Sequence, residues 1–317
     1  MCPVARSLAK RLAILIGTLL LVTVLAFLAF SVIPGDPTLS ILGAEATDEQ
    51  IAVLRTQLGL DLPIHVRYWN WLSAFVTGDL GRSYRYNMSV AELLGPRIGV
   101  TLTLALMAFV LILIIAIPLG LLCAWKQGSW LDRALTVLNQ INMAIPNFVL
   151  GIVLVYLFGL LLHLFQPNGF VYPSESVGRY LRFMFFPALA VALPKAAMTV
   201  KMLRGSILSE GREDYIRTAY SKGNSTGSVL RRHVLRNAMI PTVTFIALTV
   251  ADIVAGSIVV EQVFAVPGMG LMLISSIGSR DYPVVQAIVV IIAAAVVLCN
   301  FLADILYRVM DPRLRGR

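Results

Sequence analysis

Residues 101–125 have the sequence TLTLALMAFVLILIIAIPLGLLCAW, a run of 25 residues without a charged side chain. About 20 apolar residues in a helix cross the roughly 30 Å hydrocarbon core of a bilayer, so this run predicts a transmembrane helix. Its apolar residues are continuous and do not alternate with polar ones, which favours a helix over a strand of a membrane barrel.

The rest of the chain has the same character. Of its 317 residues 58% are hydrophobic and only 14% are charged, against about 25% charged in ordinary soluble domains. We therefore predict an all-α membrane protein with six transmembrane helices. The other five candidate spans are 12–33, 134–165, 183–203, 241–263 and 284–307. The third is over-long with Pro146 inside it, and the fourth is interrupted at Pro187 and Pro194.

The positions of lysine and arginine predict the orientation. With a cytoplasmic N-terminus, the inner segments hold 17 of the 26 basic residues and the outer segments hold 8. This bias predicts that both termini are cytoplasmic. The net charge of +9 follows mostly from it, so it gives no reason to expect nucleic-acid binding. The first apolar stretch is longer than a signal-peptide core, and we expect it to be retained.

Two loops are too long to be simple connections, and they define three predicted parts: 1–33, 34–100 and 101–317. The extracytoplasmic loop 34–100 contains helix signals. Thr47 with Gln50 resembles a capping box that opens a helix to about Leu58, and Pro63 can open a second helix rich in aromatic residues. That aromatic cluster predicts an interfacial anchor or a docking surface for an external partner.

The second long loop, 204–240, is cytoplasmic by this topology. It predicts two short amphipathic helices, 206–220 and 229–238, separated by the sequence GNSTG at 223–227. A basic loop lying on anionic lipid would explain the charges. It would not explain a helix–glycine–helix arrangement of more than thirty residues in a protein whose other inner loops are short.

At this loop the sequence resembles a known family. The sequences DYIRTA (214–219), KG (222–223) and LRNAMIP (235–241) resemble the cytoplasmic EAA-type loop of ABC importer permeases. Six further motifs match, in order, the B-type permease of dipeptide and oligopeptide importers: PGDP (34–37), LGLD (58–61), GDLG (78–81), EQVF (261–264), PG (267–268) and RDYP (280–283). The resemblance covers about residues 10–311, with departures at 220–221 and 224.

This resemblance implies that the loop 204–240 forms a coupling helix seated in a groove of a separate ATPase. The residues fit that role. Ala219 is small enough for close helix contact, and Gly223 permits a sharp turn. Glu213 and Asp214, expected near the middle of the first helix, can pair with basic groups of the partner, and Tyr215 is a residue type enriched at interfaces.

The resemblance also implies the partners. The sequence has no G-x-x-x-x-G-K-[ST] motif, so we expect no cofactor in this chain, with ATP and Mg²⁺ bound by the ATPase. The expected partners are a second homologous permease, two ATPase subunits or domains, an extracytoplasmic peptide-binding protein and membrane lipid, at the bacterial plasma membrane. Dipeptides, longer peptides and other small solutes all remain open as substrates.

Other functions fit less well. The sequence at 223–227 matches G-x-S-x-G, the nucleophile motif of hydrolases, but a polar helix and not a strand precedes it. The only later histidine is His233, just eight residues on, so we predict no catalytic residue. His65, His163 and His233 are too scattered for a metal site. The main alternative is an ion-gradient-driven secondary transporter, which usually shows inverted repeats. A scaffold without transport activity is a third class.

Two charges fall near the middle of predicted spans. Lys195 and Asp252 have opposite signs, similar depth and positions on the spans that flank the inner loop. A charge at that depth is costly unless it is paired, neutralised or facing water. We expect them to pair with each other, to line the translocation pathway, or each to reach water separately.

Overall fold

The computed structural model describes residues 3–32, 38, 42, 46–57, 59–167 and 169–310. Its regular elements are all helical, and a single isolated β-bridge joins Arg82 to Ser89 within this part of the chain. The all-α prediction is confirmed. The motif at 34–37 and the predicted helix end at Leu58 lie outside the described residues.

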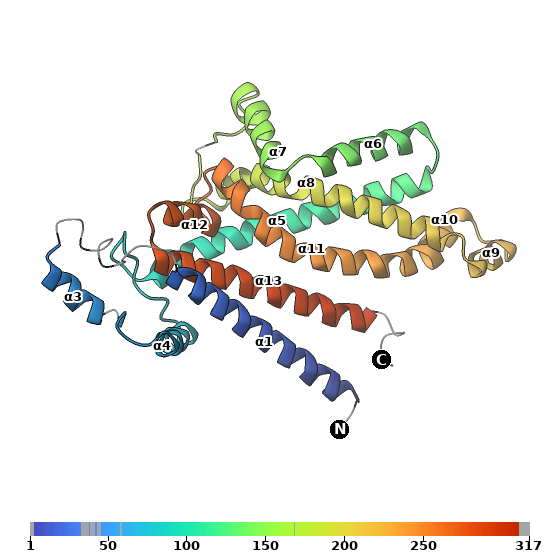
Figure 1. Ribbon diagram of the computed structural model, residues 1–317. Helices are drawn as coiled ribbons and strands as arrows, with labels where there is room; N and C mark the ends of the chain where they lie inside the picture. Colours follow the sequence, from blue (N-terminus) through green and yellow to red (C-terminus); the bar gives the residue numbers. More distant parts are fainter. Residues whose placement is uncertain are drawn as a thin grey trace. The chain divides into compact units, whose positions relative to one another are not determined.

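The chain forms two compact units. Unit 1 is Met1–Thr101 with Pro267–Val297, and unit 2 is Leu102–Val266 with Leu298–Arg317. The three-part division predicted from the sequence follows the order of the chain and stays a prediction. Five helices of the described chain are long and apolar enough to cross a membrane (Figure 1). They are α1 (Pro3–Val32), α5 (Val90–Trp125), α8 (Val177–Glu210), α11 (Leu235–Val263) and α13 (Tyr282–Met310).

The predicted span at 134–165 is not one straight helix. It consists of α6 (Trp130–Ala144) and α7 (Asn147–Leu154), and α7 continues as the π-helical segment η1 (Val155–Leu161). The two parts are bent by 105° at Pro146. A proline disfavours the helical conformation of the residue before it, and Ile145 accordingly has φ −85° and ψ 124°. The prediction of six spans holds only if this bent pair counts as one.

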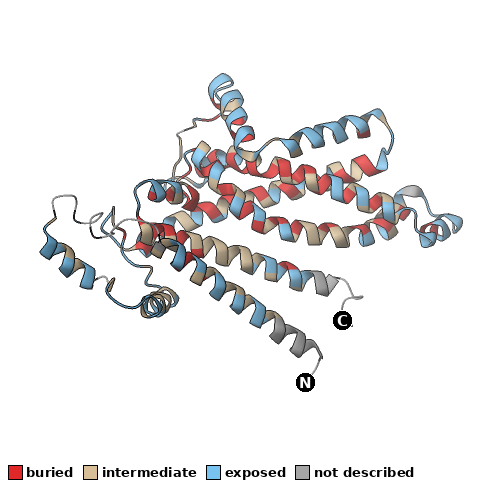
Figure 2. Ribbon diagram, in the orientation of Figure 1, coloured by how far each residue is buried: buried red, intermediate tan, exposed pale blue. Residues whose placement is uncertain are grey.

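The fourth span behaves in the opposite way. Pro187 and Pro194 lie inside α8 without ending it. Helix α8 is the central element of unit 2: α6, α7 and α11 all contact it, and 67% of its most apolar stretch is buried (Figure 2). Packed neighbours compensate for proline in a membrane helix, which explains why α8 stays continuous.

Unit 1 contains the two helices predicted in the loop 34–100. They are α3 (Asp48–Gln57) and α4 (Ile64–Val76). The capping box is confirmed: the Thr47 N–H donates to Gln50 Oε1 at 3.1 Å, and the Gln50 N–H donates to Thr47 Oγ1 at 3.4 Å. Pro63 directly precedes α4, as expected.

The aromatic residues of α4 pack against α1. The Phe27 ring lies 5.5 Å from Tyr68 and 5.7 Å from Trp71, and the Tyr68 hydroxyl lies 3.0 Å from Thr23 Oγ1. Trp69 is mostly exposed. The cluster therefore fixes α4 to the end of the first apolar helix, while the Trp69 indole contacts Tyr68 and stays largely exposed to the surroundings.

A buried carboxylate joins two of the sequence motifs in unit 1. Asp281 is fully buried. It accepts hydrogen bonds from Ser83 Oγ at 2.5 Å, from the Tyr84 N–H at 3.0 Å and from the Arg85 N–H at 3.4 Å. A buried charge of this kind requires several donors. Asp281 thus holds the turn after the GDLG motif against the start of α13.

Helices α5 and α8 approach each other closely at Gly120. A Cβ atom at this position would lie 2.8 Å from Leu203 Cδ2 and 3.1 Å from Leu203 Cβ. Gly120→Ala should therefore lower the apparent melting temperature, because overpacking costs about 1–3 kcal/mol. Gly205 on α8 has open space around it, so Gly205→Ala should leave the melting temperature unchanged or raise it. Equal melting temperatures for the two variants would contradict this packing.

Candidate functional site

The inner loop differs from its predicted form. Helix α8 continues to Glu210, a turn follows, and α9 (Asp214–Ser221) begins after it. The prediction of one helix over 206–220 is therefore wrong. Gly211 follows the end of α8, and its N–H donates to Ile207 O at 2.9 Å. Glycine is a poor helix residue and commonly marks such an end.

The second predicted inner helix is not separate. Residues 226–263 are helical throughout, as α10 (Thr226–Val229), the π-helical segment η2 (Leu230–Val234) and α11. The predicted helix at 229–238 is thus the first part of the fifth span. The inner loop therefore reduces to one short helix, α9, between two long ones.

The acidic pair lies at the beginning of α9, not near the middle of a helix as predicted from the sequence. Glu213 precedes the helix with extended backbone, φ −66° and ψ 145°, and Asp214 is its first residue. Negative charge is favourable at a helix N-terminus. Asp214 Oδ1 lies 3.6 Å from Arg217 Nη1, with both side chains exposed. Such an exposed pair contributes little to stability, so both carboxylates remain accessible.

Helix α9 has one buried and one exposed face. Ile216 and Ala219 are buried in a cluster with residues of α5, α8 and α11. Ala219 therefore packs within its own chain. Tyr215 and Tyr220 are exposed. The buried face fixes α9 to the helical base, and the other face presents aromatic and charged side chains.

A polar network ties α9 to the two long helices. The Tyr215 hydroxyl donates to Glu210 Oε1 at the end of α8. Asn237 Nδ2 on α11 donates to the Tyr215 oxygen at 2.8 Å and to Glu210 Oε1 at 3.2 Å. Partial desolvation of the hydroxyl and its bond to Glu210 raise the pKa of Tyr215, so the phenol keeps its proton. Tyr215 is a predicted site residue, whereas neither of its partners, Glu210 and Asn237, is predicted from the sequence.

Gly223 makes the turn that follows α9. Its φ is +80°, a region that residues with a Cβ rarely adopt, yet no atom lies within 4 Å of where that Cβ would be. The requirement for glycine is thus conformational. Asn224 Nδ2 donates to Ala219 O at 3.0 Å and satisfies a carbonyl at the end of α9.

The two mid-span charges are in contact. Lys195 Nζ on α8 lies 2.7 Å from Asp252 Oδ2 on α11. The Lys195 side chain is 19% exposed, whereas that of Asp252 is 63% exposed. The carboxylate is therefore paired on one side and open on the other. Leu248, Ala255 and Val259 are also exposed on α11 at helical spacing.

A second ion pair, which is not predicted from the sequence, joins α8 to α6. Arg204 on α8 donates from Nε to Asp132 Oδ1 and from Nη2 to Asp132 Oδ2, both at 2.8 Å. Asp132 is buried near the start of α6 and also accepts from the Gly128 N–H at 3.0 Å. Bidentate geometry of this kind is strong and specific. Ser129 was the sequence signal that could have placed Asp132 at a helix start. It caps α6 and accepts a hydrogen bond from the Asp132 N–H.

Comparisons with known proteins identify the family. Residues 116–316 match the family model described as binding-protein-dependent transport system inner membrane component, and residues 4–105 match the model of its N-terminal part.

Two relatives align over almost the whole chain. One, from Sinorhizobium fredii (strain NBRC 101917 / NGR234), is named "Probable peptide ABC transporter permease protein y4tP". It is 34% identical over 306 residues, which are 96% of this chain and 98% of that protein. The other, named "Glutathione transport system permease protein GsiC", is from Salmonella choleraesuis (strain SC-B67). It is 37% identical over 306 residues, 96% of this chain and 97% of the relative. The chain therefore belongs to the family of inner membrane components of binding-protein-dependent transport systems.

Proposed function

We propose that this chain is the membrane subunit of an ABC importer that moves di- or oligopeptides across the bacterial plasma membrane. The observation that carries the proposal is α9, a short helix packed on the ends of α8 and α11 with its other face exposed. The names of the two relatives, a peptide permease and a glutathione permease, support a peptide substrate. The chain has no ATPase site of its own, and the energy comes from a partner.

The surface for that partner comprises the exposed part of α9 and the adjoining turn. Glu213, Asp214 and Tyr215 contact the ATPase, while Ala219 and Gly223 set the packing and the turn that present them. Because Tyr215 is bonded to Glu210 and Asn237, a force on α9 acts directly on α8 and α11. ATP and Mg²⁺ are bound by the ATPase.

The topology and the assembly follow from the same proposal. Both termini and the loop 204–240 are cytoplasmic, and the loop 34–100 faces outward, as the basic residues indicate. A second homologous permease completes the pathway, two ATPase subunits or domains power it, and an extracytoplasmic peptide-binding protein delivers the substrate. The open side of Asp252 faces the pathway, because an ionised carboxylate is not stable against lipid.

Uptake by proteoliposomes tests the proposal. The complete transporter, supplied with binding protein, should import a labelled tripeptide when ATP is present on the ATPase side, and uptake should stop without ATP. An ionophore should not affect it. Uptake that needs no ATP and is abolished by an ionophore would instead identify a secondary transporter.

The turn at Gly223 separates coupling from folding. Gly223→Val should reduce ATP-driven uptake at least tenfold, because a β-branched residue resists φ +80°. Gly223→Asn is the matched control, since asparagine tolerates this region, and it should keep most of the activity. Membrane levels of both proteins should match the wild type. Full uptake by the valine variant would contradict the assigned role of this turn.

The unequal exposure of Lys195 and Asp252 predicts unequal effects of their substitution. Asp252→Asn should lower the folded yield severalfold, because the less exposed Lys195 loses its counter-charge. Lys195→Met should lower the folded yield less if the open side of Asp252 faces water. The double variant should regain most of the yield. Yields are measured by size-exclusion chromatography in detergent. If Lys195→Met is as damaging as Asp252→Asn, Asp252 does not face a water-filled pathway.

A further inference from the structure

Unit 1 contains a cavity of about 820 Å³. Residues from the end of α1, from α3 and α4, from the turn after Gly81 and from the start of α13 line it. Pockets for small organic ligands have volumes of roughly 300–1,000 Å³. By volume the cavity suits a ligand of several amino-acid residues, and neither the fold nor the coupling surface accounts for it.

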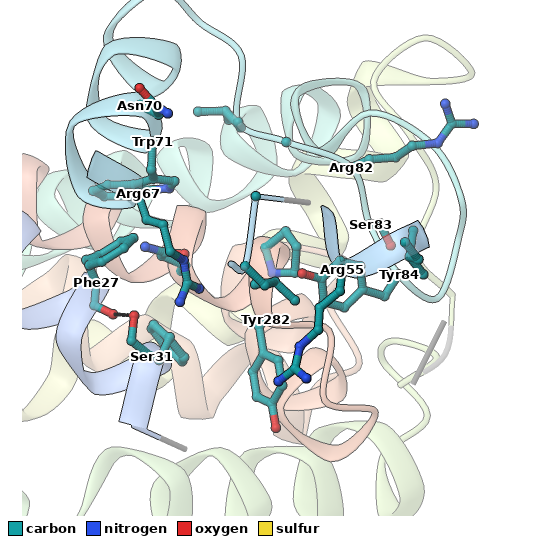
Figure 3. A pocket seen from close by; sticks show the side chains of 18 of the residues that line it. Phe27, Ser31, Arg55, Arg67, Asn70, Trp71, Arg82, Ser83, Tyr84 and Tyr282 are labelled. Carbon is teal, nitrogen blue, oxygen red and sulfur yellow. Dashed lines mark hydrogen bonds between the residues drawn. The ribbon is translucent and has the colours of Figure 1, made fainter. Parts of the chain in front are cut away.

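The charged groups of the cavity wall all have one sign. Arg55, Arg67 and Arg82 line the cavity, and its described lining residues include no aspartate or glutamate. Figure 3 shows Arg55 and Arg67 extending into the opening on the side of Tyr282, whereas Arg82 points away. The Arg82 side chain is held by Asn87, donating from Nε to Oδ1 at 2.9 Å and from Nη2 to the backbone O at 2.7 Å.

Arg67 differs from the other two. It is half-buried, and no hydrogen bond or ion pair joins its guanidinium to any residue that the structure describes. The planar fork of donors on a guanidinium matches the geometry of a carboxylate. Arg67 thus provides an unoccupied half of an ion pair, directed into a cavity of ligand size.

Aromatic side chains line the side of the cavity that α1 and α4 form. Phe27, Phe30 and Trp71 form an aromatic wall, with the Phe27 and Trp71 rings 5.7 Å apart. Ser83 and Tyr84 form another part, and Asp281 fixes both through its hydrogen bonds. Burial raises the pKa of Tyr84, which stays a neutral phenol. The site is therefore pre-formed and combines cations, neutral polar groups and aromatic rings.

We propose that this cavity binds the free C-terminal carboxylate of a short peptide, with the carboxylate at Arg67 beside Arg55 and an apolar side chain against Phe27 and Trp71. The choice of a peptide among organic anions rests on the proposed function; the need for an anion with an apolar body rests on the cavity itself. By the proposed topology the site is extracytoplasmic, and it is distinct from the pathway at Asp252.

The test compares two probes that differ by one charge. N-acetyl-Ala-Phe-Ala and its C-terminal amide are titrated calorimetrically into the purified full-length chain in zwitterionic detergent. The free acid should bind at least tenfold more tightly, since a hydrogen bond to a charged group contributes about 1.5–3 kcal/mol. Equal binding of acid and amide overturns the proposal without recourse to any variant.

Substitutions then locate the site. Arg67→Met should weaken binding of the acid at least tenfold and leave binding of the amide unchanged. Arg82→Met removes the same charge from the same wall, but Arg82 points away, so its effect should stay within about twofold. Because Arg67 has no partner among the described residues, Arg67→Met should not lower the melting temperature. If the two substitutions weaken binding of the acid equally, binding reflects only the general positive charge of the wall, and the assignment of the site to Arg67 is wrong.

A lipid phosphate is the competing source of an anion. Native mass spectrometry of protein prepared with phosphatidylglycerol measures lipid retention. Retention that requires Arg67, together with no peptide binding, would overturn the peptide assignment. Uptake assays separate this inference from the proposed function. If uptake is ATP-driven but binding of the acid does not depend on Arg67, the cavity is not a peptide site, and the proposed transport function still stands.

Discussion

An ionised side chain on a membrane helix is stable only when it is paired or in contact with water, and two cations of α8 are paired with carboxylates. Arg204 pairs with Asp132 on α6, and Lys195 pairs with Asp252 on α11. The apolar surface of α8 allows many rotations and depths against its neighbours, because dispersion contacts have little direction. The two ion pairs favour a single rotation and depth of α8. The central helix of unit 2 is thus positioned by its charges as much as by its packing.

The contacts of α9 with α8 and α11 are suited to the proposed coupling of a short inner helix to two long ones. Helix α9 rests on a hydrophobic cluster that includes Ile216 and residues of α8 and α11, and the Glu210–Tyr215–Asn237 network joins the same three elements. Dispersion contacts alone would let α9 slide. Hydrogen bonds have a narrow range of lengths and a preferred direction, so in the proposed coupling they would transmit a displacement of α9 to both long helices. The proposed coupling therefore needs no continuous mechanical path beyond these contacts.

Local signals in the sequence predicted local structure well. The Thr47 capping box and Pro63 gave the starts of α3 and α4, since these signals act within a few residues. The contact of Lys195 with Asp252 was one expected outcome of their similar depth. The helix boundary at Gly211 was missed because apolar residues at helical spacing continue on both sides of the turn. The Arg204–Asp132 pair was missed because a cation at the inner end of a span satisfies the orientation rule without any partner.

Four cations of the described chain differ in the groups that surround their charge. Lys195 and Arg204 have carboxylates of the same chain within 3 Å, so their charge is used in holding helices together. Arg82 is held by an asparagine and points outward. Arg67 is half-buried and lines a partly aromatic cavity, and none of the described residues supplies it with an anion. A ligand that supplies a carboxylate can pair with this guanidinium in bidentate geometry. The attraction of opposite charges that positions α8 is thus also the interaction by which the cavity of unit 1 would select an anion.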